Sequence, residues 1–284
     1  MKWNYGEIYK EIRRKKGMSQ QDVCGTTISR TTLSRLENNK LSPSYNTMNF
    51  LLQQINMTEE EFLFVCNDFQ YDERESVIQS FFKSASNADK DSLEKLLGKT
   101  RLYLEKNDDI YLEELGDIIH SLILLSSDTT EKIECLPRIF VNKVWDRISK
   151  MDNWFYGEIR LINCLLYYFP TETVLYFLPK LLNSIEKYEK FRSMTTLRIS
   201  ILLNISLLLI QENYYDKAEE LIIKAESYSK ISGRFDYLAI AKVRLGICKE
   251  DENLITQGMS ILSICEDQNL KKYLKKEVET FSKE

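Results

Sequence analysis

Apolar residues recur at three- and four-residue steps over most of the sequence, and few residues interrupt them. Only nine Gly and four Pro occur among the 284 residues. An all-β chain needs frequent turns, and glycine and proline are the residues that favour them. The long uninterrupted stretches therefore predict an all-α fold, whose helices bury much of the 43% of residues that are hydrophobic.

The most apolar stretch is ISILLNISLLLI, residues 199–210. A helix that crosses a bilayer needs about 20 apolar residues, so this stretch favours a buried helix. The sequence also starts without a charged and then apolar leader. We therefore expect a cytoplasmic protein with no membrane partner.

The cysteines do not have the spacing of a metal site. Six cysteines are dispersed along the chain, and none forms a Cys-x-x-Cys pair. A zinc site needs closely spaced Cys and His ligands, so we expect no metal and no cofactor. The apolar residues around the cysteines predict buried, reduced thiols.

The sequence contains no motif that points to an enzyme. It lacks a glycine-rich phosphate loop, and His120, the single histidine, lies in the apolar stretch GDIIHSLILL. That setting predicts a histidine in the core or at its rim rather than a catalytic base. We expect no catalytic residues; acid/base chemistry by the many carboxylates remains the alternative.

Charge is distributed unevenly along the chain. Residues 1–50 carry nine Lys/Arg and four Asp/Glu, a net charge of +5, whereas the whole chain has −4. The remaining residues therefore sum to −9. A basic N-terminal part on an acidic body predicts that the N-terminal part binds an anion. The alternative is a solvated surface whose charges are unevenly distributed by chance.

The first 66 residues predict five short helices with recognisable ends. Ser19 and Ser29 stand where side chains cap helix N-termini, and Thr58 with Glu61 has the spacing of a capping box. Two short helices joined by a short turn form the helix-turn-helix pattern. We therefore predict a five-helix DNA-binding domain over residues 1–66.

The segment SRTTLSRLENNK, residues 29–40, has the pattern of a recognition helix. Leu33 and Leu36 would face inward. Arginine can donate two hydrogen bonds to one guanine, and a threonine methyl can contact the methyl group of thymine. The predicted DNA-binding residues of this segment are Arg30, Thr31, Thr32, Ser34, Arg35, Asn38 and Lys40, with Lys40 on phosphate.

The segment from IRRKKGMSQQDVC to ISRTTLSRLENNK resembles the helix-turn-helix of phage repressors. The resemblance implies an ion pair between Arg13 and Glu37, and a phosphate contact by Gln20. It places Arg30, Thr31 and Arg35 on base-reading positions. The sequence departs from the family pattern in the turn, where Thr27 stands near the usual glycine.

Residues 67–284 predict eleven more helices, including 191–212 and 215–231. Tyr215, Ala218, Ile222 and Ala225 match the spacing of a tetratricopeptide repeat, in which small residues let paired helices approach. We therefore predict a tetratricopeptide-like α-solenoid, with a plain helical bundle as the alternative.

Two polar stripes interrupt apolar helices of this body. One runs through Ser193, Thr196, Ser200, Asn204 and Gln211, and the other through Arg160, Asn163 and Tyr167. Asparagine can bond a peptide main chain through its carbonyl and its amide, and Arg160 or Arg198 could bind a carboxylate. In a solenoid such stripes can line the concave groove; the alternative is satisfied packing between neighbouring repeats.

Together with the repressor-like segment, WFYGEIRLINC and RLGICKEDENLITQGMSIL resemble the Rgg family of transcription regulators. The resemblance implies a cytoplasmic homodimer that binds double-stranded promoter DNA through residues 1–66. It also implies that residues 67–284 bind a short signalling peptide, as in quorum sensing. The alternative is a repressor whose body only dimerises or binds a protein partner.

Overall fold

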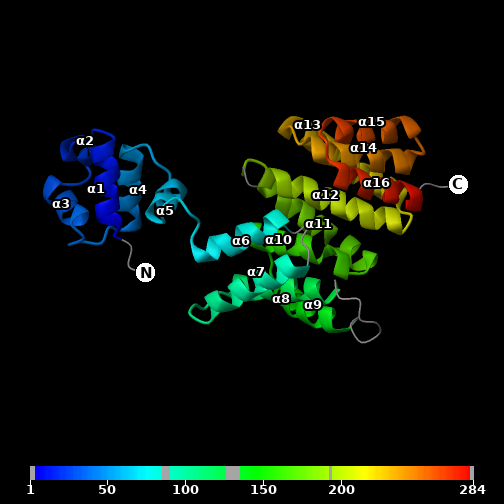
Figure 1. Ribbon diagram of the computed structural model, residues 1–284, viewed down its shortest axis with the longest axis horizontal. Helices are drawn as coiled ribbons and strands as arrows, with labels where there is room; N and C mark the ends of the chain where they lie inside the picture. Colours follow the sequence, from blue (N-terminus) through cyan, green and yellow to red (C-terminus); the bar gives the residue numbers. More distant parts are fainter. Residues whose placement is uncertain (1–3, 85–89, 126–134, 192–193, 282–284) are drawn as a thin grey trace. The chain divides into compact units, whose positions relative to one another are not determined.

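The computed structural model of the chain describes residues 4–84, 90–125, 135–191 and 194–281. Within these ranges the regular elements are α-helices and one 3-10 helix (Figure 1). This confirms the predicted all-α fold. The contacts inside the chain divide it into two units, residues 1–88 with 105–107 and residues 89–104 with 108–284.

The first unit contains the five predicted short helices and one more. They are α1 (Tyr5–Lys15), α2 (Gln20–Cys24), α3 (Arg30–Glu37), α4 (Tyr45–Gln54), α5 (Glu59–Cys66) and α6 (Glu73–Ser84). By its contacts α6 groups with this unit, which is therefore longer than residues 1–66. That residues 1–66 alone bind DNA, and that residues 67–284 are a separate peptide-binding and dimerisation domain, remain predictions.

Side-chain caps set the starts of α2, α3, α4 and α5. The hydroxyl of Ser19 accepts from the backbone of Asp22, whose carboxylate accepts from the backbone of Ser19, which completes a capping box. Ser29 caps α3 and Thr58 caps α5 through backbone hydrogen bonds of 3.0 and 3.1 Å. Ser19, Ser29 and Thr58 therefore cap the helices expected from the sequence, but for Thr58 only the hydroxyl half of the expected capping box with Glu61 is present.

The second unit is a series of consecutive helices. They are α7 (Lys90–Leu104), α8 (Ile110–Leu125), α9 (Cys135–Ser149), α10 (Tyr156–Leu165), the 3-10 helix η1 (Leu166–Tyr168), α11 (Thr171–Lys187), α12 (Met194–Gln211), α13 (Tyr215–Ser232), α14 (Phe235–Lys249), α15 (Glu252–Ile264) and α16 (Gln268–Phe281). Each of α12 to α15 packs against the next helix along the chain (Figure 1). Ala218, Ile222 and Ala225 are fully buried, as the repeat spacing predicted.

Helix α12 is the central helix of these repeats. By length and composition it is apolar enough to cross a membrane, but 67% of it is buried inside the protein. It packs against α10, α11, α13 and α14. A helix that is apolar all round belongs to a protein core when other helices surround it, and α12 is surrounded in this way.

Candidate functional site

Helix α3 presents a polar face on an apolar anchor. Leu33 and Leu36 are fully buried in the core of the first unit. The side chains predicted to contact DNA are exposed at Arg30, Thr31, Arg35, Asn38 and Lys40, and half-buried at Thr32 and Ser34. The fold thus gives α3 the inward and outward faces expected of a recognition helix; that these residues contact DNA remains a prediction.

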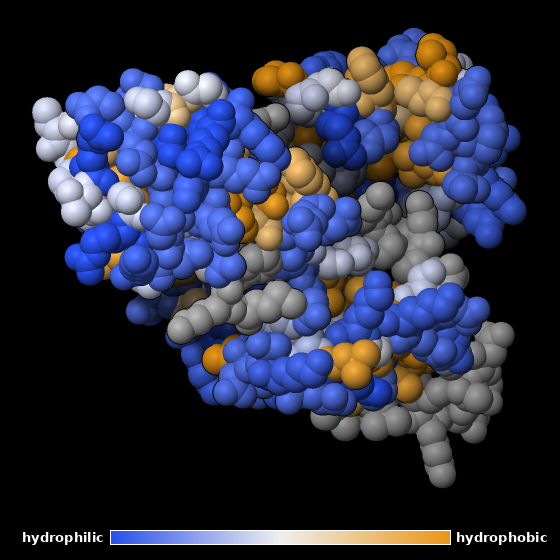
Figure 2. Space-filling model, turned by 60° about the vertical axis from the view of Figure 1, so that its left-hand side comes forward, coloured by the Kyte–Doolittle hydropathy of each residue, from blue (hydrophilic) through white to orange (hydrophobic). Residues whose placement is uncertain are grey.

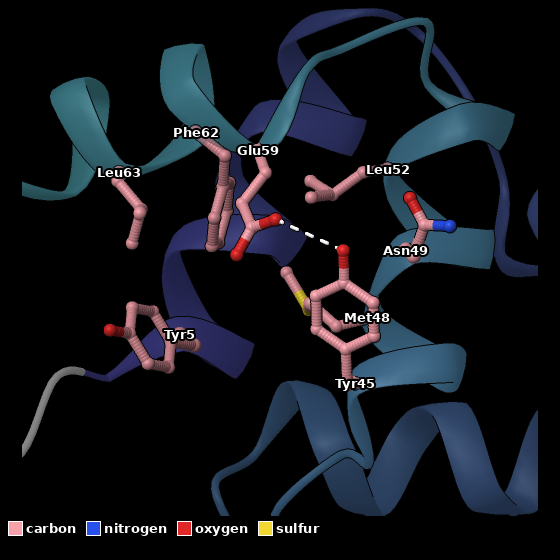
Figure 3. A pocket seen from close by; sticks show the side chains of 8 residues that line it. All are labelled: Tyr5, Tyr45, Met48, Asn49, Leu52, Glu59, Phe62 and Leu63. Atoms are coloured by element: carbon pink, nitrogen blue, oxygen red, sulfur yellow. Dashed lines mark hydrogen bonds between the residues drawn. The ribbon is translucent and has the colours of Figure 1, made fainter. Parts of the chain in front are cut away.

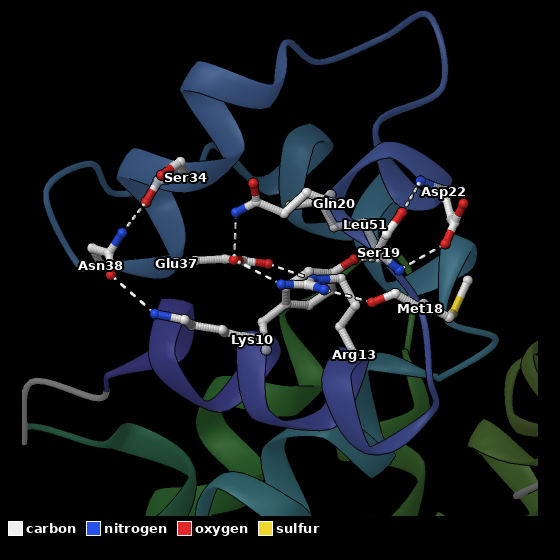
Figure 4. Close-up of polar contacts among 11 residues, drawn as sticks. Lys10, Arg13, Met18, Ser19, Gln20, Asp22, Ser34, Glu37, Asn38 and Leu51 are labelled. Atoms are coloured by element: carbon white, nitrogen blue, oxygen red, sulfur yellow. Dashed lines mark hydrogen bonds and ion pairs between the residues drawn. The ribbon is translucent and has the colours of Figure 1, made fainter.

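A buried ion pair joins α3 to α1. Arg13 donates from Nε to Oε1 of Glu37 at 2.6 Å and from Nη2 to Oε2 at 2.9 Å (Figure 4). The two side chains are 5% and 0% exposed. The hydrogen bond to Glu37 raises the pKa of Arg13, although burial acts against this. The pair implied by the repressor resemblance is therefore present.

The same carboxylate also binds the first residue of α2. Gln20 donates from Nε2 to Oε2 of Glu37 at 2.8 Å, and Arg13 donates from Nη1 to the carbonyl of Met18 at 2.5 Å (Figure 4). Glu37 thus holds three helices together. The second N–H of the Gln20 amide is the one that can reach a phosphate, because its first N–H is engaged here.

The two ends of α3 use some of the predicted DNA-binding side chains internally. The hydroxyl of Thr32 lies 2.8 Å from that of Ser29. At the other end, Asn38 donates to the carbonyl of Ser34 at 2.7 Å and accepts from Nζ of Lys10 at 3.1 Å (Figure 4). Thr32 and Asn38 therefore contribute to the helix ends, whereas Arg30, Thr31, Arg35 and Lys40 extend freely outward.

Two glycines that the sequence analysis did not use shape this site. A Cβ at Gly6 would lie 1.8 Å from the carbonyl oxygen of Leu36, so only glycine lets α1 approach α3 this closely. Gly25 has φ 52° directly after α2. The positive-φ glycine of this turn is therefore Gly25, two residues before Thr27.

The two polar stripes of the second unit meet each other. Asn163 donates to the hydroxyl of Ser200 at 3.4 Å, and Asn204 donates to Oδ1 of Asn163 at 3.0 Å. The hydroxyl of Tyr167 donates to Oδ1 of Asn204 at 3.1 Å. The structure thus joins α10 and η1 to α12 through side chains that we predicted for peptide binding, and contacts of this kind are also what the packing alternative expected.

The other predicted peptide-binding residues have surroundings of their own. Arg198 is 7% exposed, stacks on the ring of Tyr228 at 4.7 Å, and its buried Nε has no hydrogen-bond partner. Arg160 lies over the ring of Tyr156 at 5.4 Å, and Gln211 is exposed at the end of α12. Ser193 of the predicted stripe lies outside the described residues. In the described part of the chain no hydrogen bond joins Arg198 to Asn163, Tyr167 or Asn204.

A buried ion pair that the sequence analysis missed lies next to Tyr167. Arg244 of α14 donates from Nε and Nη2 to Glu277 of α16 at 2.9 and 2.7 Å, and from Nη1 to the carbonyl of Leu203 at 2.6 Å. Arg244 opens the quoted motif RLGICKEDENLITQGMSIL, but only its position in the fold gives it a partner. The pair fastens α16 to α12 and α14.

A cavity of about 120 Å³ opens in the first unit between α1, α4 and α5 (Figure 3). Its walls are mostly apolar, and Tyr45 donates to Oε2 of Glu59 at 3.4 Å at its edge. A cavity of about 190 Å³ in the second unit is lined by His120 and by the Lys143–Asp117 pair. Neither cavity is lined by a residue that we predicted to bind DNA or peptide.

Metal ligands do not gather in the described part of the chain. Among those residues no group of three or more His, Cys, Asp and Glu side chains could hold a metal ion. His120 is half-buried and lies 4.8 Å from the ring of Phe140, which is the rim position expected for it. The cysteines were predicted to be buried. Cys24 and Cys66 are, Cys164 and Cys248 are half-buried, and Cys265 is exposed, so that prediction is wrong for Cys265.

Comparisons with known proteins agree with this architecture. Residues 103–276 match the family model for the C-terminal domain of the helix-turn-helix-type transcriptional regulator Rgg, and residues 10–62 match a helix-turn-helix model. No protein with a curated description matches the sequence.

Solved structures share the fold over almost the whole chain. A protein of Listeria monocytogenes EGD-e, described as a transcriptional regulator, is 23% identical with a TM-score of 0.79, over 98% of this chain and 97% of its own. The SHP pheromone receptor Rgg2 of Streptococcus dysgalactiae is 18% identical with a TM-score of 0.72, over 97% and 99%. PlcR of Bacillus thuringiensis, solved with the peptide PapR7 and DNA, is 14% identical with a TM-score of 0.67, over 96% and 99%.

These three likenesses show a common fold, a helix-turn-helix unit followed by a tetratricopeptide-like helical domain. The family model for the C-terminal domain covers more than half of the chain. The chain belongs to the Rgg family of helix-turn-helix transcriptional regulators.

Proposed function

We propose that the protein is a cytoplasmic, homodimeric regulator that binds double-stranded promoter DNA through α3 and senses a short signalling peptide through its second unit. It would act in quorum sensing, and it would bind its ligands without catalysing a reaction. The observation that carries the proposal is the outward face of α3, with Arg30, Thr31 and Arg35 exposed on a helix that a buried ion pair holds in place.

For DNA, we assign Arg30 and Arg35 to bases, and Gln20 and Lys40 to phosphates. A lysine on a phosphate adds to the salt dependence of binding because it releases counterions. Lys40→Ala should therefore weaken binding to every sequence to a similar extent and make the salt slope shallower by about 1. Fluorescence anisotropy with the DNA upstream of the gene, at several salt concentrations, tests this. An unchanged salt slope would remove Lys40 from the contact surface.

For the peptide, we assign the group of Asn163, Tyr167, Ser200 and Asn204. These side chains are polar, only partly buried, and lie on neighbouring helices, so they can present both donors and acceptors to an extended main chain. Solved relatives are described as a pheromone receptor and as a complex with a peptide and DNA, which supports the same use of this fold.

We also assign Arg160, Arg198 and Gln211 to the peptide. Arg160 or Arg198 would bind its C-terminal carboxylate. To bind the peptide, Arg198 would have to move off the ring of Tyr228, or donate hydrogen bonds to a peptide carboxylate while it stays on that ring.

The second candidate function is a regulator whose body only dimerises or binds a protein partner. The hydrogen bonds among Asn163, Ser200, Asn204 and Tyr167 favour it, because packed repeats satisfy their polar groups in the same way. A reporter fused to the target promoter separates the two functions. Synthetic peptides added to cells should change its output under our proposal, and should leave it unchanged under the second candidate.

A homodimer follows from the small size of α3, since one short helix reads too few base pairs to select a promoter. The last helices carry exposed apolar side chains that could pair, with Ile231 82% and Ile264 83% exposed. On the face shown in Figure 2, hydrophobic residues form separate groups among hydrophilic ones. Light scattering should give twice the chain mass of 33.5 kDa. A monomer with full operator affinity would contradict the dimer.

A further inference from the structure

Four polar side chains form one continuous hydrogen-bonded chain between two segments of the second unit. It runs from Ser200 to Asn163 at 3.4 Å, from Asn163 to Asn204 at 3.0 Å, and from Asn204 to Tyr167 at 3.1 Å. Asn163 and Tyr167 come from α10 and η1, and Ser200 and Asn204 from α12. This series of hydrogen bonds therefore connects the two stripes directly.

Asn204 occupies the middle of this chain and uses both ends of its amide. Its Nδ2 donates to Asn163, and its Oδ1 accepts the hydroxyl proton of Tyr167. An extended peptide held by an asparagine uses the same two atoms, because its main-chain N–H donates to the amide oxygen and its carbonyl accepts from the amide nitrogen. A peptide main chain and the internal partners thus address the same two atoms of Asn204. Because Oδ1 has a second lone pair and Nδ2 a second N–H, the competition is for the position that the Tyr167 hydroxyl fills.

Tyr167 is the partner that can leave most readily. The residue as a whole is 50% exposed, although burial around its hydroxyl raises its pKa to about 12, and it lies in the short 3-10 helix that follows α10. Asn163 is half-buried within α10 itself. When the Tyr167 hydroxyl turns away from Asn204, water can satisfy it.

We propose that the Tyr167 hydroxyl is an internal competitor for the peptide. It occupies Oδ1 of Asn204, and a main-chain N–H of the peptide takes its place when the peptide binds. This inference rests on the proposed peptide-sensing function and deepens it: the group recognised at Asn204 is a backbone N–H donor, so the contact is independent of the peptide's side chains. The strength of the Tyr167–Asn204 hydrogen bond therefore reduces the affinity of the peptide, which must replace that bond.

The proposal predicts an effect opposite in sign to that of losing an ordinary ligand residue. Tyr167→Phe removes the competing donor and keeps the ring. Because an intramolecular hydrogen bond contributes modestly, the peptide affinity of Tyr167→Phe should rise about twofold to tenfold over that of the unaltered protein. Asn204→Ala removes the shared acceptor, so it should lower the peptide affinity both in the unaltered protein and in Tyr167→Phe.

Tyr168 provides the matched control. Its hydroxyl is buried and has no hydrogen-bond partner, so Tyr168→Phe makes the same chemical change on the adjacent residue without freeing Asn204. The affinity of Tyr168→Phe should equal that of the unaltered protein. Circular dichroism melting of each full-length variant identifies any change that arises from folding alone.

The experiment is a fluorescence anisotropy titration of full-length protein against a panel of labelled, synthetic apolar octapeptides. A rise in affinity for Tyr167→Phe but not for Tyr168→Phe supports the competition. An equal or lower affinity for Tyr167→Phe overturns it and leaves the peptide-binding proposal standing, with Tyr167 as an ordinary ligand or as a bystander. If no form of the protein binds any peptide of the panel, the peptide-sensing function fails, and the competition with it.

Discussion

The guanidinium of Arg13 and the carboxylate of Glu37 face each other inside the first unit, with N–O distances of 2.6 and 2.9 Å. This pair links α1 to the C-terminal end of α3, the helix that we assign to DNA. Removing one member of a buried pair leaves the other charge without a counter-ion, which typically costs about 3–5 kcal/mol. The orientation of α3 therefore depends on a contact that is buried beneath its exposed face.

Glu37→Ala should strongly destabilise the first unit and abolish DNA binding. Hydrogen–deuterium exchange of the amides in α1 and α3 measures the loss of protection. Glu11→Ala is the control, because Glu11 pairs with Lys15 on the surface, with side chains 60% and 74% exposed. An exposed pair contributes no more than about 1 kcal/mol. Equal exchange in the two variants would contradict the structural role of the buried pair.

Arg35→Ala should weaken binding to the cognate promoter by about 1–3 kcal/mol and relax its sequence preference. The reason is that an arginine which reads a base discriminates among sequences, whereas one on phosphate does not. Competition gel shifts with cognate and scrambled DNA measure the preference. Arg101→Ala, which removes an exposed arginine of the second unit, is the control. If Arg35→Ala retained the full preference, Arg35 would not be a base-reading residue.

Gly258→Ala should destabilise the second unit by about 1–3 kcal/mol, because overpacking forces helices apart. A Cβ there would lie 2.6 Å from Cγ2 of Val243 and 2.7 Å from the carbonyl oxygen of Ala239. Gly98→Ala is the matched control in another helix, since nothing lies within 4 Å of its Cβ position. It should stabilise by about 0.5–1 kcal/mol through helix propensity. Urea unfolding compares the two variants, and a shift of the same sign in both would refute the close approach of α14 and α15.

Cys265 should react with a thiol reagent at pH 8 while Cys24 and Cys66 remain protected. Cys265 is exposed, whereas Cys66 is 8% exposed and its burial raises its pKa to about 11. The thiolate is the reactive form, and its fraction at Cys66 grows only as the pH rises toward that pKa. Mass spectrometry of the alkylated native protein locates the label. Rapid modification of Cys66 at pH 8 would contradict its burial.

The sequence alone was sufficient to predict the local structure, that is, where helices begin and which of their side chains face inward. Ser19, Ser29 and Thr58 cap the helices that they were predicted to cap, because capping depends on residues three apart. Helices α12 and α13 lie at 194–211 and 215–232, close to the predicted 191–212 and 215–231. The inward positions of Leu33 and Leu36 follow in the same way from the helical period.

Ion pairs between distant segments could be predicted from the sequence only where a family pattern named both partners. The Arg13–Glu37 pair was expected from the repressor resemblance, whereas the Arg244–Glu277 pair was missed. Both are long-range charge pairs in a chain with 39 basic and 43 acidic residues. Spacing along the sequence cannot choose among so many partners.

The sequence determined which faces of the helices are polar, and the tertiary structure decided what those faces meet. The stripe on α12 was predicted from its period, but that Asn204 lies between Asn163 and Tyr167 depends on how α12 packs against α10 and η1. In the same way, the packing of α12 against α13 decided that the guanidinium of Arg198 lies over the ring of Tyr228. A helical period fixes angles within one helix, whereas the angle at which two helices face each other is set by the side chains packed between them.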